Sequence, residues 1–161
     1  MGFFSKSRRL KTWNDLPQNY CAEIRKHIGE DGWQWLMELT ESYQLLEQPF
    51  FSKPEIFADK PEERMIPLAL FLNSGGNHLA MQQKFSDAEK TFLLSLRLFS
   101  DESNVAHASL AMVYNLQGNT EKAKLHAKIA LRDLEDDNLF NAADQSGADQ
   151  QKQMLREIIE K

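Results

Sequence analysis

A self-similarity with an offset of 35 residues is the feature that most restricts how this chain can fold. The segments GNHLAMQQKFSDAEKTFLLSL, from Gly76, and AMVYNLQGNTEKAKLHAKIAL, from Ala111, align at this offset without a gap. Small residues recur where two helices must approach closely, and larger ones recur where a neighbour fills space. The repeat therefore predicts two related helix-turn-helix units. The matched pairs are Gly76/Ala111, Leu79/Tyr114, Ala88/Ala123, Phe92/Ala127, Ser95/Ala130 and Leu96/Leu131.

The rest of the sequence is also helical in pattern. Apolar residues recur at a spacing of 3.6, and no segment alternates apolar and polar residues as a half-buried strand does. We therefore expect an all-α fold. A first helix should open at Asp15 and Pro17 and end near Gly29, with Tyr20, Ile24 and Ile28 along one side. Further helices are expected at 33–47, 67–82, 87–99, 104–117, 120–135 and 147–160.

Local residues indicate where several of these helices begin and end. Ser86 and Glu89 have the spacing of a capping box, and Gly118 is suited to a left-handed helix stop before an Asn119 or Thr120 cap. The segment 48–67 contains four of the five prolines and is predicted to be a connector without one regular helix. The chain thus divides into a basic, flexible N-terminus (1–12), a helical region with a Pro-rich connector (13–66), the two repeats (67–137) and a C-terminal capping helix (138–161).

Composition restricts the cellular setting and the class of partner. A chain of 161 residues with 42% hydrophobic residues can bury one core, and a single cysteine, Cys21, predicts a cytoplasmic protein. The formal net charge of the chain is −5. Because the first twelve residues carry four basic groups and no acid, the rest of the chain carries a net charge of about −9. An acidic body argues against nucleic-acid binding. The basic, Phe-containing N-terminus is compatible with a membrane surface, but we favour a frayed, solvated terminus and do not expect membrane contact.

The two aligned segments resemble the tetratricopeptide repeat (TPR) family, over about Ala69 to Asp137. Each has a small residue, an aromatic or Leu, an Ala, an aromatic or Ala, a small residue and a Leu in order. The resemblance implies a TPR-like α-solenoid with an N-terminal helical extension and a C-terminal capping helix. It departs from the family where the early tryptophan position holds Leu72 and His107, and where Gly75 replaces a leucine.

The resemblance also implies a function without catalysis: a scaffold or adaptor that holds a peptide or helix of a protein partner in a concave groove. Two alternatives are a bacterial chaperone of the type III secretion class and, from another class, a small helical enzyme or metal-binding protein. The groove is expected to be mostly apolar, without the cations that bind a C-terminal carboxylate, and either open or filled by the N-terminal helices. Carried over by register, its residues are Leu70, Asn73, Asn77, Ala80, Met81, Val105, Ala108, Met112, Asn115 and Leu116.

No residue pattern indicates a catalytic site, a metal or a cofactor. The four histidines, His27, His78, His107 and His126, have neither i, i+4 pairing nor ligand spacing, so each is expected at a surface or between helices. Cys21 has no histidine near it in sequence and is expected to be a packed residue. The acidic run at Asp133 lacks the glycine of a calcium loop.

Overall fold

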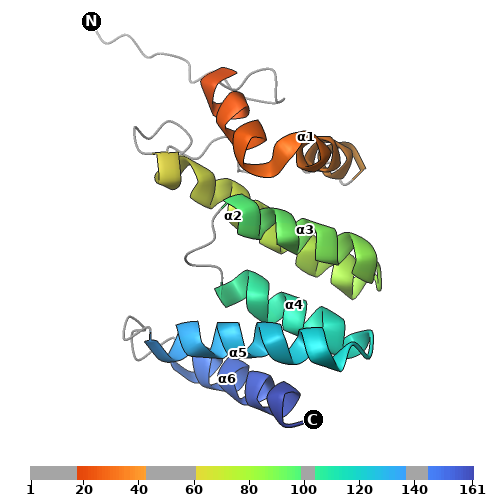
Figure 1. Cartoon of the computed structure of the whole chain (residues 1–161), viewed down its shortest axis with the longest axis vertical. Helices are drawn as coiled ribbons and strands as arrows, with labels where there is room; N and C mark the ends of the chain where they lie inside the picture. Colours follow the sequence, from red (N-terminus) through yellow and green to blue (C-terminus); the bar gives the residue numbers. More distant parts are fainter. Residues whose placement is uncertain (1–17, 43–60, 99–103, 137–144) are drawn as a thin grey trace, which may run out of the picture. The chain divides into compact units, whose positions relative to one another are not determined.

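The computed structural model describes residues 18–42, 61–98, 104–136 and 145–161. Within these ranges the chain forms six α-helices and no strand, so the all-α prediction is confirmed. Helices α4 (Asn104–Leu116), α5 (Thr120–Asp136) and α6 (Gln145–Glu160) pack in succession as antiparallel pairs, as Figure 1 shows, and α3 (Phe85–Leu98) also contacts α4. The chain divides into two compact units, residues 1–68 and 69–161. None of the described helices has the length and apolarity needed to cross a bilayer.

The first unit contains α1 (Gln18–Ser42), in which two helical segments meet at Gly29. Gly29 has φ 72° and ψ 176°, a backbone conformation that a glycine adopts without a steric penalty. The predicted helix break at this glycine is therefore confirmed, although the second segment starts directly after it. The predicted apolar side of the first segment is buried, and the predicted N-terminal cap at residues 15–17 lies outside the described residues. The unit's buried apolar residues are Tyr20, Ile24, Ile28, Leu36, Leu39, Met65 and Leu68.

Helix α2 (Pro61–Met81) begins six residues before the predicted start, so the prediction that 61–67 belongs to an irregular connector was wrong. Pro61 occupies the first helical position, where a missing N–H costs nothing. Pro67 lies inside the helix, where its missing N–H removes one bond to a carbonyl in the previous turn. The rest of the predicted connector, up to residue 60, lies outside the described residues, as does the segment 1–12.

The remaining helices match their predicted ranges within two residues: α3 (Phe85–Leu98), α4 (Asn104–Leu116), α5 (Thr120–Asp136) and α6 (Gln145–Glu160). The prediction of a capping box at Ser86 was wrong. Helix α3 already begins at Phe85, and the Glu89 carboxylate accepts a hydrogen bond from the Tyr114 hydroxyl instead. The predicted cap at Asn119 is confirmed, since its Oδ1 accepts the N–H of Lys122 at 3.2 Å.

Helices α2 and α4 end in turns of the same type, at positions 35 residues apart. Gln83 and Gly118 have φ values of 60° and 74°. The N–H of each donates to the carbonyl three residues back, Ala80 at 2.9 Å and Asn115 at 3.1 Å. The next N–H in each turn, from Lys84 and Asn119, donates to the carbonyl five residues back, Leu79 at 2.9 Å and Tyr114 at 2.8 Å. Both turns are therefore Schellman motifs, which satisfy the last carbonyls of a helix.

The two hairpins also bury the same positions. In all six residue pairs matched by the sequence offset, both members have the same degree of burial. The crossing of α2 on α3 combines Gly76 with the fully buried Phe92 ring, and a Cβ built on Gly76 would lie 2.6 to 2.9 Å from three ring carbons. The equivalent pair in the second hairpin is Ala111 and Ala127, both fully buried. The missing side chain of Gly76 thus leaves room for the Phe92 ring, which is larger than the equivalent Ala127.

Helix α6 packs against α5 and also contacts α4. Its apolar side follows the predicted pattern: Leu155 and Ile158 are buried, and Met154 and Ile159 are partly buried. Arg156 on its exposed side forms an ion pair with Glu135 of α5, with an N–O distance of 3.1 Å.

Replacing Gln83 by Gly should stabilise the protein. A side chain in the left-handed conformation costs about 1–2 kcal/mol, which glycine avoids, so we expect a gain of about 1 kcal/mol after its larger loss of chain entropy. The thermal midpoint should rise by about 2–4 °C. The matched variant Gly118→Gln should shift the midpoint in the opposite direction. Two shifts of the same sign would contradict the equivalence of the turns.

Two neighbouring glycines of α2 should respond oppositely to alanine. Gly75→Ala meets no atom within 4 Å and should stabilise the helix by about 0.5–1 kcal/mol. Gly76→Ala forces the buried Phe92 ring to move and should cost about 1–3 kcal/mol. Urea unfolding of both variants measures the difference, and equal stabilities would show that the helix crossing is not tightly packed.

Candidate functional site

Exposed apolar side chains gather on two helices of the second unit. Seven large apolar residues are exposed among those described, and five of them lie on α2 and α4. The most exposed are Met81 at 83% and Leu116 at 62%. All five were among the predicted groove residues. We call this surface the α2–α4 face, formed by Leu70, Met81, Val105, Met112 and Leu116.

The two helices expose equivalent positions. Leu70 and Met81 are eleven residues apart, as are Val105 and Leu116, and three helical turns of 3.6 residues bring such positions back to one side. Asn77 is exposed at the position equivalent to Met112, and Ala80 and Asn115 are both partly exposed. The face thus presents the same pattern twice at the 35-residue offset.

Two predicted groove residues are not on this surface. Ala108 is 2% exposed and Asn73 is 8% exposed, so neither offers a side chain to a ligand as the prediction required. They occupy equivalent positions three residues after Leu70 and Val105, which places them about 60° around the helix axis. Asn73 nevertheless differs from an ordinary core residue, because its buried Oδ1 has no hydrogen-bond partner among the residues that the structure describes. Such a buried acceptor costs about 1–3 kcal/mol.

Polar contacts border the apolar residues. The Ser109 hydroxyl of α4 donates to Oδ1 of Asn77 on α2 at 3.2 Å, which joins the two helices across the face. Lys161, directly after α6, donates from Nζ to Oδ1 of Asn115 at 3.3 Å. This lysine brings one cation beside Asn115 from 46 residues further along the chain, where helical register could not place it.

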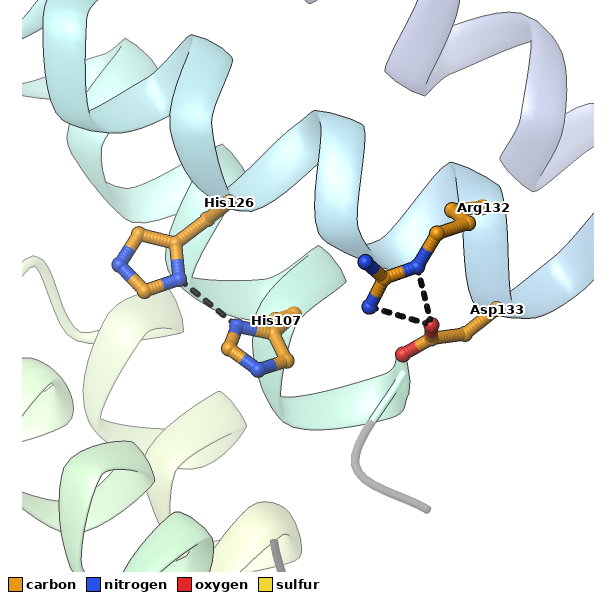
Figure 2. A network of polar contacts seen from close by, with 4 residues as sticks. All are labelled: His107, His126, Arg132 and Asp133. Atoms are coloured by element: carbon orange, nitrogen blue, oxygen red, sulfur yellow. Dashed lines mark hydrogen bonds and ion pairs between the residues drawn. The ribbon is translucent and has the colours of Figure 1, made fainter. Parts of the chain in front are cut away.

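A second polar cluster lies between α4 and α5. His107 on α4 and His126 on α5 face each other with their Nδ1 atoms 2.8 Å apart, as Figure 2 shows. The ring of Tyr114 stacks on that of His126 with centroids 5.4 Å apart, and the Tyr114 hydroxyl donates to Glu89 on α3 at 2.7 Å. The Lys122 ammonium is 5.0 Å from the centroid of the Tyr114 ring and 3.8 Å from the Glu89 carboxylate. The cluster thus links three helices.

Burial controls the protonation of this cluster. It lowers the pKa of His126 to about 4, with smaller contributions from the neighbouring His107 and Lys122, while Glu89 acts in the opposite direction. Burial also lowers the pKa of His107, against an opposing effect of Asp133. The Tyr114 hydroxyl has a raised pKa because it is buried and donates to the Glu89 carboxylate. At neutral pH both histidines are therefore uncharged.

The sequence contained a signal for the histidine pair. At the 35-residue offset His107 corresponds to Leu72 and His126 to Thr91, and both of these residues are fully buried in the first hairpin. Positions buried in one repeat are expected to face the same helix crossing in the next. The prediction placed both histidines between helices or at a surface but did not bring them together.

The other candidates remain separate. His27 and His78 are exposed and bond to residues four positions away in sequence, His27 to the Glu23 carbonyl within α1 and His78 to the amide of Gln82 directly after α2. Burial raises the pKa of the Cys21 thiol, which keeps it in the less nucleophilic protonated form at neutral pH. In the part of the chain that the structure describes, no three His, Cys, Asp or Glu residues are grouped so as to hold a metal ion.

Comparison with known proteins adds no family to these observations. The chain matches no protein-family model, no curated protein and no solved structure.

Proposed function

We propose that residues 69–161 form a non-enzymatic protein-interaction module that binds a short, extended, apolar peptide segment of a partner on the α2–α4 face. One observation carries this proposal: five of the seven large apolar residues exposed in the described ranges lie there. Single exposed apolar residues are normal on a protein surface, whereas a group of them marks an interaction site. Complete burial of such a side chain contributes about 1.5–3 kcal/mol.

The polar atoms of the face favour an extended peptide over a helix. Asn77 lies on the exposed side of α2, and Asn115 on the partly exposed side of α4. An extended peptide carries free backbone N–H and C=O groups, which asparagine amides can bind. The N–H and C=O groups of a helix are largely used within the helix. The asparagines therefore match an extended segment.

The TPR resemblance supports the same function. Two hairpins with equivalent turns, equivalent buried pairs and equivalent exposed positions have the organisation of a tandem repeat. In this proposal α2 and α4 are the first helices of two TPR-like repeats, and α6 covers the last of them. A ligand on the α2–α4 face would then lie where TPR proteins bind peptides.

The double variant Met112→Asp/Leu116→Asp tests the face. Exposed substitutions usually cost less than ~0.5 kcal/mol, so the variant should remain folded. Peptides selected from a phage-displayed random library on the wild-type full chain should be apolar, and fluorescence anisotropy should show at least tenfold weaker binding to the variant. The control Leu93→Asp/Leu125→Asp changes the two exposed leucines of α3 and α5 and should bind as the wild type does. Equal binding by all three proteins, or the absence of any selected peptide, would reject the proposal.

Asn73→Leu should separate stability from binding. The substitution removes the unpaired acceptor and keeps the same number of side-chain heavy atoms with the same branching at Cγ, so the free protein should gain about 1 kcal/mol. Because the side chain of Asn73 is only 8% exposed and offers nothing to a ligand, the affinity of this variant for the selected peptides should equal that of the wild type. Weaker peptide binding by a folded Asn73→Leu protein would show that this buried amide contacts the ligand after all.

A further inference from the structure

The contact between His107 and His126 is a hydrogen bond that requires a single shared proton. The Nδ1 atoms are 2.8 Å apart, whereas the ring centroids are 5.1 Å apart and the ring planes differ by 29°. The nitrogens therefore lie between the two ring centres and point at each other, as Figure 2 shows. In neutral imidazole one nitrogen carries a proton and the other accepts. One ring thus donates from Nδ1 and the other accepts at Nδ1.

This geometry accommodates one added proton and not two. The first added proton goes to Nε2 of the donor ring and leaves the Nδ1–Nδ1 hydrogen bond in place. A second proton would have to go to Nδ1 of the acceptor ring, which would place two N–H groups against each other at 2.8 Å. Two positive rings would also repel each other. The pair therefore titrates as a unit, with its second step strongly disfavoured in the folded protein.

The surroundings of the pair do not compensate a second charge. The groups that act on the rings come from α3, α4 and α5, and both of the carboxylates among them have another partner. Glu89 accepts from the Tyr114 hydroxyl and lies near Lys122, and Asp133 accepts from Arg132 at 3.2 Å. Lys122 and Arg132 are positive and oppose protonation. The pKa of His126, lowered to about 4, agrees with these contacts.

We propose that the His107–His126 pair is an acid-sensitive contact between α4 and α5, which opens this hairpin when both rings are protonated. In the unfolded chain each histidine takes up its proton near pH 6.5. Because the folded pair holds one proton fewer, acidification below this pH favours unfolding, by up to tenfold in the unfolding constant per pH unit. The contribution to stability is fully present above pH 6.5 and is lost as the pH falls towards the second step.

Urea unfolding of the full chain between pH 7.5 and 5.0 tests the pair. The variant His126→Asn keeps a polar atom near the position of Nδ1 but takes up no proton. Between pH 6.5 and 5.0 the unfolding constant of the wild type should rise about 15-fold more than that of the variant, which is the effect of one additional histidine that becomes protonated only in the unfolded chain. The control His27→Asn, which changes an exposed histidine, should follow the wild type. An equal pH dependence of wild type and His126→Asn would overturn the proposal.

A second measurement decides the question if His126→Asn does not fold. The ¹⁵N resonances of the imidazole rings report the charge of each histidine in the folded wild type. At pH 5.0 the pair should contain one charged and one neutral ring. Two charged rings in a protein that remains folded at that pH would contradict the shared-proton contact.

Discussion

The reversal of the chain after α2 and after α4 depends on one backbone conformation, the left-handed one at Gln83 and Gly118. It lets two N–H groups bond the last carbonyls of each helix and returns the chain antiparallel to the helix it has left. Tyr114 depends on this turn in two ways. Its carbonyl closes the second turn, while its side chain stacks on His126 and bonds to Glu89 of the preceding hairpin. The turn therefore positions both the hairpin and its contact with the neighbouring hairpin.

The sequence predicted most helix positions because their signals are local. Gly29 and Gly118 end helical segments through their own backbone freedom, and Asn119 caps through its own side chain. The predictions failed where the same residue type is compatible with two different local structures or contacts. Pro61 and Pro67 both suggested a break, but only the context of the whole helix shows that one begins it and the other is tolerated inside it. Glu89 has the spacing of a capping residue, but its carboxylate binds Tyr114, 25 residues away.

The candidate site was predictable to a similar extent. Helical register identified the exposed apolar residues of α2 and α4, because residues three or four apart share a face whatever the neighbours are. Asn73 and Ala108 lie at the edge of that face, where burial depends on neighbouring helices that register alone does not place. The contacts of His107 with His126 and of Lys161 with Asn115 join separate helices, and no local pattern contains them.

The unequal volumes at the two helix crossings have a consequence for how a chain with two similar hairpins avoids misassembly. Repeat proteins are prone to pairing a helix with the wrong copy of its partner. If α2 paired with α5, Gly76 would meet Ala127 and leave a void, and if α4 paired with α3, Ala111 would meet the Phe92 ring and overlap with it. Voids and overlaps both cost stability. The Gly–Phe and Ala–Ala combinations therefore favour the native pairing of each helix over pairing with the equivalent helix of the other hairpin.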